Sequence, residues 1–268
     1  MTIDYRDIHE PQDIERAVDL EAHVWRMEDR QVVPASTMIA MRHVGGHIGG
    51  AFDGEKLVGF SLALVGKRER EVFLWSHMTA VDPAYQTRRI GYGLKQAQRR
   101  WAMQHNFAHI RWTFDPLLRV NANFNLRRLG ALADRYHVNI YGTMNDGINR
   151  GMPSDRLEVS WELASARVVE HASAEAQPVL VETHPSGYLL RADERGYPQI
   201  DEKPHATWHF IEIPYDLETL KRQDMGLALA WRMATREVFL QAFAQGYSVV
   251  DFVNAPDRCW YVLFSGAG

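Results

Sequence analysis

Apolar side chains in the N-terminal half recur with the spacing of helices. This spacing predicts a first helix near Pro11–Trp25 and a second, shorter one at Ala35–His43. A third predicted helix runs to about His105 and carries apolar residues at i, i+4, i+7 and i+11 on one face. The residues of that face are Ile90, Leu94, Ala97 and Trp101.

Short apolar runs between these helices predict strands. Asp53-Gly54 separates the runs His47–Phe52 and Leu57–Val65, and this dipeptide between apolar runs predicts a hairpin. A strand at Val72–Val81 ends before Pro83, because proline cannot donate to a ladder. Later patterns predict strands at His109–Phe114, Tyr136–Tyr141 and Leu157–Leu163, and a short helix at Ala122–Leu129 closed by Gly130. Strands alternating with helices predict an α/β domain over residues 1–165.

The C-terminal region carries a second set of patterns. Residues 172–178 are small and polar and end in proline, which is typical of a linker. Beyond it, residues 179–268 contain a long predicted helix, Met225–Gln245, and apolar runs at Val179–Val181, Trp208–Ile213, Tyr247–Val253 and Trp260–Phe264. Both halves contain a strand ended by proline, a helix that starts with small residues, and a buried strand. A degenerate internal repeat is therefore expected, with a coincidence of common strand–helix–strand units as the alternative.

Charge and cysteine content narrow the function classes. The 268 residues carry a formal net charge of −4, so no global positive field attracts nucleic acid or an anionic membrane. No stretch approaches the roughly 20 apolar residues of a membrane helix. Cys259 is the single cysteine, lies in a predicted buried strand, and excludes an intrachain disulfide. A cytoplasmic protein is expected.

The segment Val81–Leu94 contains the pattern with the clearest chemistry. A strand stops at proline, a polar loop follows, and Gly91 and Gly93 lie at the start of a helix. The first N–H groups of a helix lack intrahelical partners and, with the helix dipole, favour an anion. Arg88 and Arg89 add positive charge there. This arrangement predicts a diphosphate site, and a capped helix with a solvated basic start is the alternative.

This segment resembles the acyl-CoA loop of the GNAT acyltransferases, Gln/Arg-x-x-Gly-x-Gly/Ala after a strand ending Val-x-Pro. Gln86 and Gly91 match, Gly93 keeps the small residue that is common just beyond, and Arg89 stands where the family usually has glycine. Because an arginine resists a positive φ, this departure puts the local backbone in question. The resemblance spans roughly residues 1–165. It includes Asn121–Gly130, which is similar to a later helix of the family.

The resemblance implies a fold, a co-substrate and its contacts. The implied fold is a GNAT-like α/β (α+β) domain, with a mixed, mostly antiparallel sheet flanked by helices, followed here by the degenerate half-repeat. The implied co-substrate is acetyl-CoA or another acyl-CoA, with no metal. The residues expected to contact it are Val81, Gln86, Thr87, Arg88, Arg89, Ile90, Gly91, Tyr92, Gly93, Asn121 and Asn123.

The family mechanism also implies catalytic groups. An amine attacks the thioester directly, and a base removes its proton. His77 is the candidate base, because such a base often lies on this strand and Trp75, His77 and Thr79 are expected on one face; a structural histidine is the alternative. The family's acid is often a tyrosine, whose position is taken here by Leu126. Tyr136 or Tyr141 could replace it unless they are packing aromatics, and water is a further candidate.

Arginines are the candidate substrate anchors. Arg156 ends a long polar loop and is expected to clamp an acceptor or acyl carboxylate, with a salt bridge to Asp155 or Glu158 as the alternative. Arg232 and Arg236 are i, i+4 on the last predicted helix, where a solvated face is favoured over a substrate anchor.

Thr113–Leu117, Asn121–Gly130 and Ser154–Arg156 resemble a poorly characterised GNAT branch that is sometimes linked to N-acylation of amino acids. The favoured function is therefore an N-acyltransferase acting on a small-molecule amine, with an amino acid as one candidate. A non-catalytic acyl-CoA-binding module and a partner subunit that binds no CoA are the alternatives. The oligomeric state stays open, with a homodimer among the options.

Overall fold

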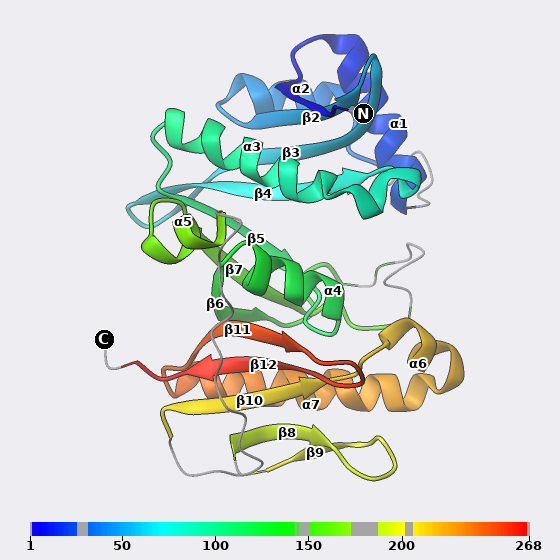
Figure 1. The fold of residues 1–268 in the computed structure, drawn as a ribbon, viewed down its shortest axis with the longest axis vertical. Coiled ribbons are helices and arrows are strands. Elements are labelled where there is room, and N and C mark those ends of the chain that lie inside the picture. Colours follow the sequence, from blue (N-terminus) through cyan, green and yellow to red (C-terminus); the bar gives the residue numbers. More distant parts are fainter. Residues whose placement is uncertain are drawn as a thin grey trace. The chain divides into compact units, whose positions relative to one another are not determined.

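The computed structural model describes residues 2–25, 32–142, 144, 151–172, 187–201 and 206–266 (Figure 1). These residues form two compact units. The first unit comprises the residues up to Trp112 together with Glu162–Ala164, and the second comprises the remaining described residues. The two units reflect how compactly the described residues pack. The predicted domains, 1–165 and 179–268, are instead defined by a recurring fold. Their boundaries therefore stay a prediction.

The first unit contains an ordered sheet of mostly antiparallel strands. The strand order is β1 (Asp4–Asp7), β2 (His47–Asp53), β3 (Lys56–Arg68), β4 (Glu71–Val81) and β5 (His109–Phe114). The predicted hairpin joins β2 to β3, and Gly54 in its turn has a φ of +60°. β4 and β5 run parallel and pair at Leu74–Ile110 and Trp75–Arg111.

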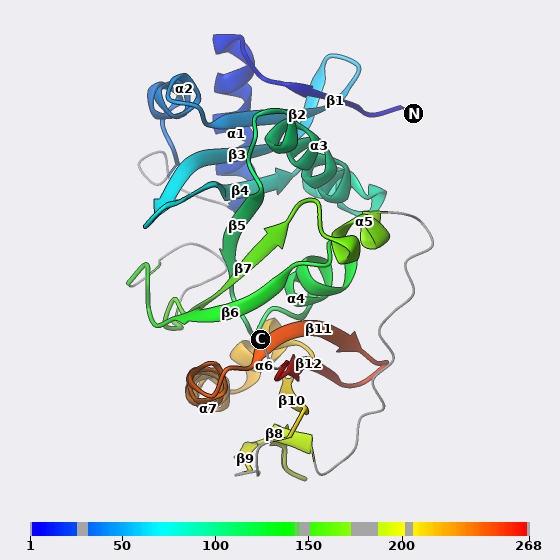
Figure 2. The same ribbon diagram turned by 90° about the vertical axis from the view of Figure 1, so that its left-hand side faces the viewer.

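Helices cover both faces of this sheet (Figure 2). α1 (Pro11–Trp25) and α2 (Ala35–His43) pack on one face, around a buried cluster that includes Ile14, Met38 and Phe60. α3 (Ile90–Gln104) packs on the other face, where Ile90 and Leu94 meet Ala51 and Val58. A 3₁₀ helix, η2 (Pro83–Arg88), connects β4 to α3, so the predicted polar loop is helical.

The second unit contains a further run of paired strands. Its strand order is β7 (Arg156–Glu162), β6 (Leu132–His137), β11 (Ser248–Asn254), β12 (Cys259–Phe264), β10 (Trp208–Ile213), β8 (Tyr188–Ala192) and β9 (Pro198–Ile200). Its helices are α4 (Arg119–Ala122), the π-helical turn η3 (Asn123–Arg128), α5 (Ala166–Ala172), α6 (Leu217–Gln223) and α7 (Met225–Ala244). Figure 2 shows α7 and α4 on opposite sides of these strands. Among the pairs described, β8–β10 runs parallel.

The predicted fold class, a mixed and mostly antiparallel sheet flanked by helices, is confirmed. Two local predictions are wrong. The strand expected at Tyr136–Tyr141 is β6 and begins at Leu132, because its N-terminal part alternates weakly and contains a register shift. The helix expected at Ala122–Leu129 begins at Arg119 and continues as a π-helical turn. Residues 173–181, which hold most of the expected linker and the run Val179–Val181, lie outside the described residues.

The strand pairing of the C-terminal segment differs from that of residues near 74–114, and the degenerate half-repeat itself stays a prediction. The C-terminal segment does contain the sequence β10, α7, β11. However, β12 lies between β10 and β11 and pairs antiparallel with both. In the first unit β4 and β5 are direct parallel neighbours. The C-terminal segment therefore does not reproduce the strand pairing of residues near 74–114, because the shared sequence pattern specifies elements but not their neighbours.

Candidate functional site

The predicted cofactor loop forms the junction between η2 and α3. Gly93 N–H donates to the Arg89 carbonyl at 3.1 Å, which closes the first turn of α3. Ile90, Gly91 and Tyr92 precede that bond at the first helical positions. Backbone N–H groups at these positions have no intrahelical acceptor and, together with the helix dipole, favour a negatively charged group. The backbone at this junction could therefore hold an anionic group.

Arg89 adopts the left-handed conformation, with φ 58° and ψ 18°. It is the residue that stands in place of the family's glycine, and the backbone nevertheless takes the conformation that a glycine adopts easily. A non-glycine residue in this region costs about 1–2 kcal/mol. Such strain persists where the surrounding structure enforces it, often at functional sites.

The two glycines of the loop have different surroundings. A Cβ at Gly91 would have only the Val81 Cγ2 atom within 4 Å, at 3.9 Å, so the space above Gly91 is open to an approaching group. A Cβ at Gly93 would lie 2.1 Å from the ring and hydroxyl of Tyr5, so Gly93 allows α3 to pack against β1. Gly91 therefore leaves room for a ligand, whereas Gly93 is needed for the packing of α3 against β1.

The remaining loop residues surround this start. Gln86, Arg88 and Arg89 have exposed side chains, and Val81 is half-buried at the end of β4. Gln86 donates to the Val81 carbonyl at 3.4 Å, and the Arg88 guanidinium lies 4.9 Å from the centre of the Tyr85 ring. Thr87 lies in η2, and its side chain is outside the described residues.

β4 contains a β-bulge at His77. Ser76 pairs with Ala63 and Met78 pairs with Leu62, so His77 is an extra residue without a partner on β3. The bulge reverses the alternation of side chains. Ser76 contacts Lys95 of α3, whereas Met78 packs against the cluster beneath α1 and α2.

The expectation that Trp75, His77 and Thr79 share one face is therefore wrong, because Trp75 precedes the bulge and Thr79 follows it. The His77 side chain is exposed, yet its surroundings partly desolvate it and lower its pKa below 6.5. His77 therefore stays neutral, as a base must be, to lower pH than an ordinary histidine.

Lys95 is a feature that the sequence pattern did not single out. Its side chain is buried, and its Nζ lies 2.7 Å from Ser76 Oγ. Burial lowers the pKa of Lys95 to about 7. The buried stripe of α3 is Ile90, Leu94, Lys95, Gln98 and Ala102, rather than the predicted stripe. The signal that could have revealed this feature from the sequence is the presence of a lysine and a glutamine, Lys95 and Gln98, on the buried face of an amphipathic helix.

The second unit holds the other predicted residues. Asn121 is exposed at the end of α4, and Asn123 is half-buried at the start of η3. Leu126, in the family's tyrosine position, is fully buried. Tyr141 is exposed and its hydroxyl lies 3.3 Å from Thr113 Oγ1.

A buried group of charges involves the three predicted arginines. Arg232 is fully buried and bonds Asp115 at 2.5 Å. Arg156 is also buried, lies 3.8 Å from the same carboxylate, and donates to the Asp155 backbone carbonyl at 2.9 Å. Arg236 holds Asp155 through two hydrogen bonds of 2.8 Å.

The predicted solvated face for Arg232 and Arg236 is therefore wrong. Both carboxylates named as alternative partners of Arg156 have another partner: Arg236 holds Asp155, and His137 bonds Glu158 at 2.7 Å.

This group, which we call the arginine cluster, contains buried donors that have no partner among the described residues. Three arginines, Arg156, Arg232 and Arg236, face the two carboxylates Asp115 and Asp155. Nε and Nη1 of Arg232 have no hydrogen-bond partner among the described residues. Tyr136 donates to Asp155 at 2.8 Å, and burial followed by the Asp155 charge raises its pKa, so its proton is held within the cluster. The arginine cluster therefore suits an anionic group such as a carboxylate.

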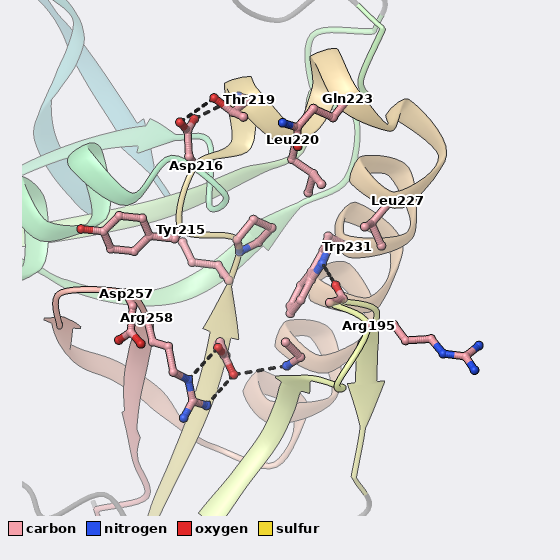
Figure 3. A pocket seen from close by; sticks show the side chains of 15 residues that line it. Arg195, Tyr215, Asp216, Thr219, Leu220, Gln223, Leu227, Trp231, Asp257 and Arg258 are labelled. Carbon is pink, nitrogen blue, oxygen red and sulfur yellow. Dashed lines mark hydrogen bonds and ion pairs between the residues drawn. The ribbon is translucent and has the colours of Figure 1, made fainter.

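A cavity of about 400 Å³ lies beyond the end of β10 in the second unit (Figure 3). Pro214, Leu220 and Trp231 form apolar walls. Arg258 donates to Glu212 at 2.8 Å in its wall, and Asp216 accepts from the Thr219 N–H at 3.0 Å. A second cavity of about 370 Å³ lies near Phe107 and Leu163 in the first unit. Neither cavity is lined by residues of the Gln86–Gly93 loop.

Three further properties concern residues within the described ranges. Burial raises the pKa of Cys259 to about 12, and its S–H donates to the Ile213 carbonyl at 3.6 Å, as expected for a buried thiol. These residues include no group of three or more His, Cys, Asp or Glu side chains placed to hold a metal ion. Within the same ranges, no helix combines the length and the apolar character needed to cross a membrane.

The chain was compared with solved structures and with known protein sequences. Its structural neighbours are GNAT-family acetyltransferases. The ribosomal-protein-S18-alanine N-acetyltransferase from Escherichia coli is 14% identical, with 62% of this chain and 96% of that chain aligned and a TM-score of 0.49. An aminoglycoside 6'-acetyltransferase type Ii is 17% identical over 62% of this chain and 99% of that chain, with a TM-score of 0.48.

A GNAT-family acetyltransferase from Streptococcus pneumoniae is 14% identical over 59% of this chain and 98% of that chain, with a TM-score of 0.47. No protein-family model and no curated protein sequence matches the chain. Identities and TM-scores this low carry no conclusion about substrate or activity.

Proposed function

We propose that the chain is a CoA-dependent N-acyltransferase that moves an acetyl or similar acyl group from acyl-CoA to the amine of a small molecule. The start of α3 is the observation that carries this proposal. Arg89 holds the left-handed conformation there, the space above Gly91 is open, and three backbone N–H groups precede the first bond of the helix. A diphosphate matches these donors and the adjoining guanidinium groups.

Each proposed contact follows from this geometry or from the family resemblance. The N–H groups of Ile90, Gly91 and Tyr92 and the side chains of Arg88 and Arg89 would hold the diphosphate. Gln86, Thr87, Gly93, Asn121 and Asn123 stay proposed contacts, and a backbone N–H of the strand ending at Val81 would polarise the thioester oxygen. His77 is the proposed base, and its lowered pKa supports the role because a neutral imidazole accepts the proton of the attacking amine.

The arginine cluster supports an acceptor or acyl group that carries a carboxylate, and an amino acid meets this description. Arg156 is the proposed anchor, and the unpartnered donors of Arg232 add to the same argument. The single buried cysteine supports a cytoplasmic enzyme. A non-catalytic acyl-CoA-binding module is the second candidate, favoured by the buried Leu126 at the position of the family's acid.

Binding of acetyl-CoA, measured by isothermal titration calorimetry, tests the proposed site. Gly91→Asp places a carboxylate in the open space beside the diphosphate, so we expect affinity to fall about tenfold or more, which is about 1.4 kcal/mol. Gly226→Asp is the matched control, because Gly226 is the second residue of α7 as Gly91 is of α3. An aspartate near a helix start is compatible with folding in both variants.

Unchanged affinity in a folded Gly91→Asp variant would refute the placement of the diphosphate. A wild-type protein that binds no acetyl-CoA would refute the function. A thiol-release assay over a panel of amines, with and without a carboxylate, then separates the enzyme from the binding module, because a binding module releases no thiol with any acceptor.

A further inference from the structure

Lys95 is a buried cation, and its partners among the described residues include no carboxylate. Only 4% of its surface is exposed. Its Nζ lies 2.7 Å from Ser76 Oγ on β4, 3.5 Å from Gln98 Oε1 on α3, and 3.9 Å from the centre of the Trp112 ring on β5. All three partners are uncharged. A buried ammonium that lacks a counter-charge costs folding free energy, so an apolar side chain would serve the packing of α3 better.

The position of Lys95 relative to β4 points to a role in the reaction. Ser76, its nearest partner, directly precedes the bulge residue His77. The β4–β5 pairing described above ends at Trp75, one residue before Ser76. Lys95 therefore reaches the sheet where β4 leaves its regular pairing with both neighbouring strands. Bulges of this kind commonly redirect groups at active sites.

We propose that the Lys95 ammonium gives its proton to the thiolate that leaves during acyl transfer, an inference that rests on the proposed function. The amine nitrogen of the acceptor forms a bond to the thioester carbon and loses a proton to His77. The carbon–sulfur bond then breaks, and its electron pair goes to sulfur. Lys95 protonates that sulfur, becomes neutral, and regains a proton from solvent.

The surroundings of Lys95 fit the proton transfer. Desolvation alone lowers its pKa from 10.5 to about 7. A thiol has a pKa of about 8.5, so a proton moves downhill from Lys95 to a thiolate, whereas it would move uphill from an ordinary lysine. Lys95 has neighbours on β4, α3 and β5: Ser76, Gln98 and Trp112. None of these three side chains titrates near pH 7, so in this group only Lys95 can supply the proton.

The pH dependence of kcat distinguishes this role from a structural one. His77 must be neutral, so the rate falls with acid below 6.5, and Lys95 must be protonated, so the rate falls with alkali above about 7. In Lys95→Met we expect kcat to fall roughly 10²–10⁴-fold and the alkaline limb to vanish. The acid limb, the KM for acetyl-CoA and the calorimetric affinity should change less than about threefold. Lys67→Met changes an exposed lysine near the end of β3, and this control should match the wild type.

Lys95→Arg separates proton donation from simple positive charge, because arginine keeps the charge but does not release a proton near neutral pH. We expect it to keep the affinity and not restore kcat; a Lys95→Arg variant with wild-type kcat would overturn the proposal. A Lys95→Met variant that keeps kcat and both limbs would also overturn it, and would leave the proposed function intact. A wild-type protein that binds acetyl-CoA and transfers nothing to any amine overturns both.

Discussion

At the scale of single residues, Arg89 combines a strained backbone conformation with a positively charged side chain. Its φ of 58° is one that glycine adopts freely and arginine adopts at a cost. Glycine would remove the strain and also remove a guanidinium from the start of α3. The arginine therefore exchanges stability for positive charge at the junction, which is the balance expected of a binding residue.

Arg89→Gly should raise the free energy of unfolding by up to about 1 kcal/mol, because relief of the left-handed strain exceeds the added entropy of the unfolded chain. It should also weaken acetyl-CoA binding roughly three- to tenfold by removing a charge-assisted contact. Glu69→Gly is the control, since Glu69 has a similar φ of 53° in the turn between β3 and β4. We expect the same stabilisation in urea denaturation and no change in affinity. Equal loss of affinity in both variants would contradict a binding role for Arg89.

Predictions for single residues are right where a sequence pattern allows a single outcome. They are wrong where the outcome depends on which side chains the fold buries. The cysteine in an apolar run was expected to be buried, and Cys259 is buried. The sequence predicts a solvated face for Arg232 and Arg236, because i, i+4 spacing does not reveal which face of a helix is covered. Lys95 was missed for a similar reason, since its environment is created by β4 and β5 and not by its neighbours in sequence.

At the scale of elements, the docking of α3 decides the shape of the candidate site. Ile90 and Leu94 bury against β2 and β3, and Gly93 lets the helix approach Tyr5 on β1. This close approach holds the first turn of α3 beside the end of β4. The site therefore depends on packing behind the helix as well as on the loop in front of it.

Gly93→Ala should cost about 1–3 kcal/mol of unfolding free energy, because its Cβ would overlap the Tyr5 ring. Gly91→Ala is the matched control, with open space around its Cβ, and helix propensity should make it neutral or stabilising by up to about 1 kcal/mol. Urea denaturation measures both. In a Tyr5→Ala background the cost of Gly93→Ala should largely disappear. A cost that persists in that background would place the strain elsewhere.

Periodicity predicted most elements because each has one buried face. The limits of α1, α2 and β5 follow the predicted ranges, and the hairpin at Asp53-Gly54 forms as expected. The bulge at His77 could not be predicted, since it is a property of the register between β3 and β4. The same limit applies to the strand order of the C-terminal segment: β12 comes last in the chain and yet lies between β10 and β11, because apolar runs do not encode which strands become neighbours.

At the scale of the whole molecule, ion pairs join parts of the second unit that lie far apart in the sequence. Arg232 on α7 bonds Asp115, which is 117 positions earlier, and Arg236 bonds Asp155, which is 81 positions earlier. Both carboxylates are buried. Buried carboxylates need their cations, so residues 113–142 and 151–161 and α7 are expected to fold as one cooperative body.

A double-mutant cycle on Asp115 and Arg232 tests this coupling. Arg232→Met leaves Asp115 with Arg156 at 3.8 Å as its remaining ion-pair partner in the arginine cluster, so we expect a loss of roughly 3–5 kcal/mol in unfolding free energy. Asp115→Asn keeps the oxygen that accepts from the Leu117 N–H, and adding it to Arg232→Met should restore most of the loss. Arg191→Met, which breaks the more exposed pair with Asp201, should cost at most about 1 kcal/mol. If Arg232→Met costs no more than Arg191→Met in urea denaturation, the buried pair does not couple these segments.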